Sequence, residues 1–337
     1  MSNKPIDVIT MGRVSMDLFS QNIGVPFDQV KGFDTGIGGS PTNIAVGTSR
    51  LGLNAILLTA VGPDETGNFV RRYLANEGID TQYIPVKSDT HTGLAIVAVQ
   101  PPDKFPLTFY RDNPADIYLT IDDVDAVPIA ESKVMLLSGT ALSRGSCRDA
   151  TLYAAEQAQR QDATVFMDLD LRPDQWTHTQ AFHTNIATIL PKLDVVIGTE
   201  EEFYAALSQD ASTIMQGQAV TEDQAVELET LIQTLLTQSE GPATLVLKRG
   251  ARGVSIYQKE ATVLDVPGFP VEILNTVGAG DAFASGLIYG FLKEWDWYQS
   301  ARMANACGAI VVTRHGCSNA LPTEAEVLEF VDSRGGF

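Results

Sequence analysis

Short apolar runs and helix-type patterns alternate along almost the whole chain, and this alternation constrains the fold more than any other feature. Each run has the length of a buried strand, and the segment after it repeats its apolar residues at helical spacing. This order predicts an α/β fold with a mostly parallel sheet covered on both faces. The predicted strands are 7–11, 55–61, 134–138, 164–168, 194–197 and 244–248, and the predicted helices are 65–77, 146–160, 179–190, 221–238 and a series from 279 to 332.

Two stretches break the alternation, at residues 13–36 and 91–111. Residues 92–99 alternate as in a half-exposed strand, and residues 107–111 follow a proline-rich turn. Both stretches therefore predict extended segments outside the main sheet. The 337 residues, 44% of them hydrophobic, suffice for one large domain or two modest ones.

Charge and composition exclude several classes of protein. A formal net charge of −19 argues against a nucleic-acid partner, because phosphate contacts need a basic surface. No apolar run approaches the roughly 18 residues of a membrane span, and the first residues lack a signal-peptide core, so a cytoplasmic protein is expected. The three cysteines have neither disulfide-framework nor zinc-site spacing.

A glycine-rich turn at 275–287 runs directly into a predicted helix and carries one carboxylate, Asp281. Gly278 and Gly280 permit a tight turn, and the amide groups at a helix start attract negative charge. Asp281 is placed to accept a proton from a hydroxyl that attacks a phosphoryl group. Taken alone, the turn fits equally well a capped helix whose Asp complements the helix dipole.

A second glycine cluster, residues 38–52, also precedes a predicted helix. Ser40 can serve as its N-cap and Pro41 as its first residue. Asn43 lies in that first turn and can hydrogen-bond a polyol. A tight strand-to-helix connection is the alternative, but two such turns in one chain favour a binding function.

With both turns in place, the sequence resembles the PfkB or ribokinase-like family of carbohydrate kinases over essentially its whole length. The Gly-Gly-x-x-x-Asn segment at 38–43 and the Thr-x-Gly-Ala-Gly-Asp-x-Phe segment at 276–283 carry the resemblance, and a Walker P-loop is absent. The resemblance implies a single ribokinase-like domain over 1–337, a three-layer αβα sandwich whose small β lid comes from about 13–36 and 91–118. It also implies ATP and Mg²⁺ as cofactors.

The resemblance assigns roles to individual residues. The implied catalytic residues are Asp281 as base and Gly278, Ala279 and Gly280 as the anion-binding turn; the implied sugar ligands are Asp17, Gly38, Gly39 and Asn43. The implied nucleotide residues are Thr199, Lys248, Gly250, Gly253 and Asn305, and Glu202 would orient water around Mg²⁺. Structural alternatives stay open: a turn residue for Asp17, an acidic helix start for Glu202, a solvated side chain for Lys248 and a packing amide for Asn305.

Some family members hold a monovalent cation beside the anion-binding turn. By position its ligands here would be Asn275 and the carbonyl groups of Val277, Val311, Arg314 and Gly316. The usual residue at 275 is Asp, and Asn keeps an oxygen but loses the charge. Activation by K⁺ is therefore a hypothesis that this substitution puts in question.

Two arginines indicate the class of substrate. In family members that act on keto sugar acids, a Tyr-Arg pair and an Arg-Pro-x-x-Trp segment occupy the positions of Arg111 and Arg172. Arginine grips a carboxylate with two parallel hydrogen bonds, which a neutral sugar does not need; surface salt bridges are the alternative. The expected substrates are 5-dehydro-2-deoxy-D-gluconate first, 2-dehydro-3-deoxygluconate second and fructose third. A catalytically silent sugar- or nucleotide-binding regulator stays open, as does a homodimer.

Overall fold

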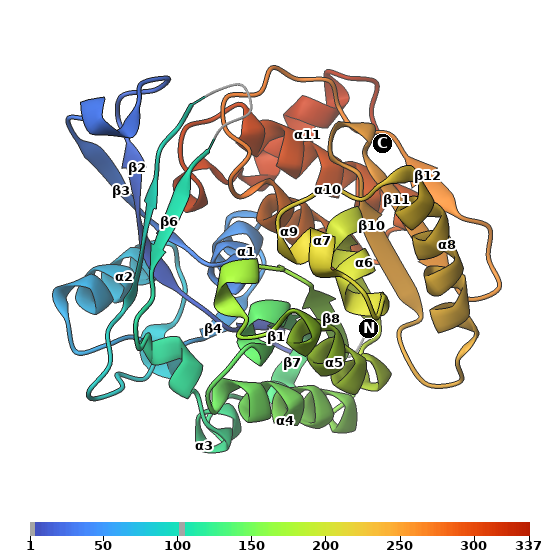
Figure 1. Ribbon diagram of the computed structural model, residues 1–337, viewed down its shortest axis with the longest axis horizontal. Helices are drawn as coiled ribbons and strands as arrows, with labels where there is room; N and C mark the ends of the chain where they lie inside the picture. The colour runs from blue at the N-terminus through green and yellow to red at the C-terminus, as the bar shows by residue number, and fades with distance from the viewer. Residues whose placement is uncertain (1–3, 101–104) are drawn as a thin grey trace.

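The structure, a computed structural model, describes residues 4–100 and 105–337. Within these residues the strands form an eight-stranded sheet and a separate four-stranded sheet, which projects at the left of Figure 1. The strands of the larger sheet are, in spatial order, β12 (Leu264–Val266), β11 (Val254–Gln258), β10 (Thr244–Lys248), β9 (Val195–Thr199), β8 (Thr164–Asp168), β7 (Ser132–Ser138), β1 (Ile6–Met11) and β4 (Ala55–Leu58).

The six strands from β4 to β10 run parallel, and β11 and β12 add an antiparallel edge. All six predicted strands are therefore present and parallel, as the alternation predicts. β8 and β10 have the predicted bounds, whereas β4 ends at Leu58, three residues earlier than predicted.

Helices cover both faces of the larger sheet and complete a three-layer αβα sandwich. One face packs against α1 (Ser40–Arg50), α2 (Glu65–Asn76), α9 (Ala279–Leu292), α10 (Trp297–Val312) and α11 (Glu324–Asp332). The other face packs against α3 (Ile121–Asp125), α4 (Cys147–Arg160), α5 (Thr179–Ile189), α6 (Glu200–Leu207), α7 (Ser212–Met215) and α8 (Glu222–Thr237).

Strand β7 shows why the central strands read as unbroken apolar runs. Val134 and Leu136 point into one core, while Met135 and Leu137 point into the other. Successive side chains of a strand face opposite sides, so a strand with helices on both sides must be apolar at every position.

The two stretches that break the alternation supply the smaller sheet. Its strands are, in order, β3 (Phe33–Gly38), β2 (Ser15–Ser20), β5 (Gly93–Val97) and β6 (Leu107–Tyr110). Phe19 and Val97 pack with Cys317 in a small core of their own. Strands are thus confirmed at both ends of each predicted stretch, while residues 101–104 of the second stretch lie outside the described residues. β3 runs two residues past the predicted end at 36.

The N-cap prediction at Ser40 is wrong. Ser40 is the first residue of α1, and Gly39, with φ of 102°, is the cap. The Ser40 hydroxyl donates instead to the Asp168 carboxylate at 2.7 Å, a partner 128 residues away. A local capping pattern gives no information on such a distant partner.

The strand order of the larger sheet reverses at β1. The chain passes from β1 to its neighbour β4 and later returns to β7 on the other side of β1. Ligands of open parallel sheets bind at such a reversal. No helix among the described residues has the length and apolar content needed to cross a membrane.

Candidate active site

The turn at the start of α9 is built to receive an anion. Gly278 is the N-cap and has the left-handed φ of 84°; a Cβ atom there would lie 2.6 Å from the Cys317 sulfur. The backbone amides of Gly280 and Asp281 make no hydrogen bond to any described residue. Such amides at the positive end of a helix dipole favour a phosphoryl group.

Asp281 lies in the first turn of α9, with its carboxylate beside α1. Its Oδ2 accepts a hydrogen bond of 2.6 Å from Asn43 Nδ2, so the two glycine-rich turns meet at one point. Burial, together with the carboxylates of Asp168 and Asp170, raises the pKa of Asp281 to about 6, against the opposing hydrogen bond from Asn43. A carboxylate with that pKa is a competent base near neutral pH.

Asp17 on β2 faces the glycine pair that precedes α1. A Cβ atom at Gly38 would lie 2.0 Å from Asp17 Oδ2, so a larger residue at 38 would displace this carboxylate. Ser15 donates to Asp17 Oδ1 at 2.6 Å, and burial raises the pKa of Asp17 to about 6. The four residues predicted as sugar ligands are therefore adjacent, and Asp281 adds to the raised pKa of Asp17.

The pH dependence of catalysis should reflect these two carboxylates. Both have a pKa of about 6, so kcat/KM is expected to fall as the pH drops below that value, with a slope steeper than one. The measurement is kcat/KM from pH 5 to 8 for the native chain and for Asp17→Asn. The variant should show a slope of one, and a native profile that is flat down to pH 5 would contradict the assignment.

Gly39 holds a conformation and a contact that other residues cannot keep. Its φ is 102°, and a Cβ atom would lie 2.4 Å from the Arg13 carbonyl oxygen. Gly39→Ala is expected to destabilise the fold by about 2–5 kcal/mol, through backbone strain and overpacking together. Gly24→Ala is the matched control, because Gly24 has φ of 80° with nothing within 4 Å. Equal urea midpoints for the two variants would contradict the close-contact argument.

The sequence reasoning missed two carboxylates at the carboxyl end of β8. Asp168 Oδ2 accepts from Ser40, and Asp168 Oδ1 accepts from Lys248 at 3.1 Å. Asp170 accepts from Arg13 at both oxygens, at 3.1 and 3.2 Å, and Arg172 Nη2 lies 3.0 Å from Asp170 Oδ1. Their position directly after a buried parallel strand is the signal that could have identified them.

Two guanidinium groups share the single carboxylate of Asp170. Burial would raise the pKa of Asp170, but Arg13 and Arg172 outweigh that effect and hold it below its usual value. Asp170 is thus ionised, and the trio carries one net positive charge. The carboxylate of Asp170, followed by those of Glu202, Asp281 and Asp168, raises the pKa of Arg172.

The two arginines predicted to bind a carboxylate differ in accessibility. The Arg172 side chain is 39% exposed, whereas that of Arg111 is 6% exposed. Arg111 Nη1 and Nη2 donate to the two oxygens of Asp116 at 3.0 and 2.6 Å. The fork of Arg111 is therefore already occupied, and Arg172 is the arginine that is open to a ligand.

A cavity of about 560 Å³ adjoins the anion-binding turn on the side of α10. All five residues predicted to bind nucleotide line it, together with two residues of the turn: Thr199, Lys248, Gly250, Gly253, Asn305, Ala279 and Gly280. Gly253 has φ of 94°, and a Cβ atom there would lie 2.1 Å from the Val266 carbonyl oxygen. Asn305 donates to the carbonyl groups of Val266 and Pro267 and so fixes one wall of the cavity.

Lys248 provides a fixed cation between the cavity and the turn. Its ammonium group lies 3.1 Å from Asp168 and 3.7 Å from Glu202, and a Cβ atom at Gly280 would approach it to 3.2 Å. Burial would lower the pKa of Lys248, but the two carboxylates outweigh it and raise the pKa. Lys248 is therefore charged and adjacent to the amides of the turn.

Glu202 is held by the backbone at both carboxylate oxygens. Its Oε2 accepts from the Thr199 amide at 2.8 Å, in a capping box that starts α6, and Oε1 accepts from the Leu171 amide at 3.1 Å. Burial raises the pKa of Glu202, and Lys248 opposes that rise. The capping role that the sequence left open is thus present, and the carboxylate still faces Lys248.

The residues predicted to bind a monovalent cation hydrogen-bond one another in two separate sets, one around Asn275 and one that joins Val311 to Arg314. Asn275 is fully buried and bonds both Val277 and Gly316, while the Val311 carbonyl accepts from the Arg314 amide at 3.0 Å.

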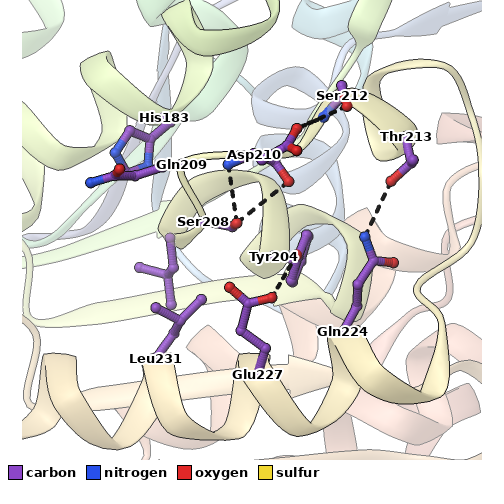
Figure 2. A pocket seen from close by; sticks show the side chains of 11 residues that line it. His183, Tyr204, Ser208, Gln209, Asp210, Ser212, Thr213, Gln224, Glu227 and Leu231 are labelled. Carbon is purple, nitrogen blue, oxygen red and sulfur yellow. Dashed lines mark hydrogen bonds between the residues drawn. The ribbon is translucent and has the colours of Figure 1, made fainter.

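Another cavity, of about 580 Å³, lies among α5, α6, α7 and α8 and contains none of the predicted residues. Figure 2 shows the Tyr204 hydroxyl donating to Glu227 and the Gln224 amide donating to Thr213. These polar side chains bond one another.

The αβα sandwich with its small second sheet has the ribokinase-like fold, and the comparisons with known proteins place the chain among sugar kinases. The sequence pattern of the pfkB family of carbohydrate kinases matches residues 6–324, and the chain belongs to this family.

Curated relatives and solved structures agree with that assignment. The 5-dehydro-2-deoxygluconokinase of Geobacillus kaustophilus is 35% identical over 98% of this chain and 94% of that protein. The 5-dehydro-2-deoxygluconokinase of Bacillus licheniformis is 33% identical over 97% of this chain and 96% of that protein. A fructokinase of Vibrio cholerae, crystallised with fructose, ADP and a potassium ion, superposes with a TM-score of 0.79 at 25% identity over 98% of this chain and 99% of its own.

Proposed function

We propose that this kinase transfers the γ-phosphoryl group of ATP to the 6-hydroxyl of 5-dehydro-2-deoxy-D-gluconate. The observation that carries the proposal is the Asp281 carboxylate, with a pKa near 6, held by Asn43 beside two unbonded backbone amides. A regulator that had lost catalysis would have no need for a base in this state. The two curated relatives support the choice of substrate.

The roles in the reaction follow from the geometry. ATP would lie in the cavity beside α10, with its phosphates between Lys248 and the turn at Gly280. Asp281 accepts the proton of the attacking hydroxyl, while the amides of Gly280 and Asp281 stabilise the charge on the transferring group. Asp17 and Asn43 orient the sugar, and the smaller sheet covers it as a lid.

Mg²⁺ fits this site as an ion that arrives with the nucleotide. Among the described residues no three acidic, histidine or cysteine side chains group into a metal site of their own. Mg²⁺ commonly binds through one or two carboxylates plus phosphates and water. Glu202 and Asp168, on either side of Lys248, would orient its water shell. The ion supplies neutralisation of phosphate charge.

The trio of Asp170 and its two arginines explains the preference for an acid. Arg172 is the most accessible of the three arginines near the site, and it would pair with the substrate carboxylate. Arg13 shares Asp170 and lies 5.5 Å from the centre of the Phe109 ring on the smaller sheet. Arg111 keeps an indirect role, because its bond to Asp116 fixes the backbone of Val14.

The test is ADP release with a panel of sugars, followed by phosphorus NMR of the product. We expect release with 5-dehydro-2-deoxygluconate and a phosphomonoester on its 6-hydroxyl. Faster turnover of 2-dehydro-3-deoxygluconate or fructose would assign one of those substrates instead. Binding without ADP release for every sugar would identify a silent regulator. A cytoplasmic location and a homodimer stay predictions, to be checked by cell fractionation and sedimentation.

A further inference from the structure

The side chain of Asn275 is held at both ends just before the anion-binding turn. Its Nδ2 donates to the Gly316 carbonyl at 2.7 Å, and its Oδ1 accepts from the Val277 amide at 3.0 Å. A backbone carbonyl can only accept and a backbone amide can only donate, so these two partners fix which end is nitrogen. Asn275 is fully buried, and exchanging its amide nitrogen and oxygen would leave both the Gly316 carbonyl and the Val277 amide without a hydrogen bond.

These residues do not fit a monovalent cation. A cation at this place needs the Gly316 carbonyl as a ligand, but the partly positive N–H of Asn275 already points at that oxygen. The Asn275 oxygen is neutral and bonded to Val277, and the Val311 carbonyl accepts from Arg314. A bound ion would have to displace a buried hydrogen bond and repel the amide donor, with no carboxylate to compensate its charge.

We propose that the Asn275 amide replaces the cation, so that this kinase works without a monovalent ion. The amide joins the chain before Gly278 to the loop at Gly316, and that loop continues into Cys317, against which Gly278 packs. Asn319 fixes the same loop, because its Oδ1 accepts from the Cys317 amide at 3.0 Å. The turn is therefore held in place by neutral hydrogen bonds where an ion would otherwise bind.

The rate measurement rests on the proposed function, whereas a melting measurement does not. ADP release is compared in KCl, NaCl and tetramethylammonium chloride at equal ionic strength, since screening alone changes rates. The native chain should turn over at the same rate, within twofold, in all three salts. If no sugar gave ADP release in any salt, the proposed function would be refuted. The melting temperatures alone would then test whether the chain binds a monovalent cation.

The melting temperature of the native chain should be the same in KCl and in tetramethylammonium chloride. Asn275→Asp is the informative variant, because a carboxylate there faces the Gly316 carbonyl without a donor between them. It should melt at a higher temperature in KCl, as expected when an ion binds only the folded state, and its rate should become dependent on K⁺. A native chain that K⁺ stabilises, or accelerates tenfold, would overturn the proposal even if the variant fails to fold.

Discussion

Asp281→Asn is expected to lower kcat by about 10²- to 10⁴-fold while leaving the KM of the sugar acid nearly unchanged. Asparagine has the shape of aspartate and its oxygen can still accept from Asn43, but it cannot take a proton from the attacking hydroxyl. The measurement is steady-state ADP release at saturating ATP and sugar acid. Turnover near the native value would contradict the role of Asp281 as base.

Stability provides the control for that variant. The pKa of Asp281 rises from 3.8 to about 6, so the folded state binds this proton more tightly than the unfolded chain does. Ionisation of Asp281 therefore lowers stability as the pH rises from about 4 to 6, and above that the native chain carries the full cost. Asp281→Asn removes this cost, so at pH 7 it should melt at the native temperature or above. A lower melting temperature would attribute the rate loss to misfolding.

Arg172→Gln is expected to raise the KM of sugar acids by about 10- to 150-fold, because a hydrogen bond to a charged group contributes about 1.5–3 kcal/mol. The KM of a neutral sugar such as fructose should change far less, since it has no carboxylate to pair. Asp170 keeps Arg13 as a partner in this variant, so the fold should persist. The measurement is KM for acid and neutral sugar on the same preparation.

Arg111→Lys serves as the comparison, because lysine keeps a charge for Asp116 but loses the fork. It should lower the melting temperature and leave the ratio of the two KM values unchanged. Arg111 would be the carboxylate ligand if Arg111→Lys raised only the KM of the sugar acid and Arg172→Gln raised the KM of both sugars equally.

Most of the larger sheet could be predicted because its strands carry local signals. β8 and β10 are apolar on both faces and end at charged residues, so a short apolar run closed by a charge defines their bounds. The start of α1 was predicted wrongly, because the Ser40 hydroxyl can hydrogen-bond either the first turn of its own helix or Asp168, and it bonds Asp168. Only the packed fold brings Asp168 within reach, and a buried carboxylate outweighs a local cap.

The candidate site also contains residues with local sequence signals and residues whose contacts depend on distant parts of the chain. The position of Asp281 could be predicted because a helix start with a left-handed glycine, here Gly278, is a local feature, whereas Gly280 is part of the helix and has no positive φ. The pairing of Arg111 with Asp116, and that of Asn275 with Gly316, depends on which groups the fold leaves open. Arginine and asparagine residues look the same in the sequence whether they face a ligand or a buried partner, so their availability follows only from the structure.

The ratio of kcat/KM for 5-dehydro-2-deoxygluconate to that for fructose tests the central claim most directly, with both sugars measured on the native chain. Pairing of the substrate carboxylate with Arg172 predicts a ratio of at least about 10² in favour of the acid. A ratio near one, or a preference for fructose, would contradict the account of this site as a sugar-acid kinase.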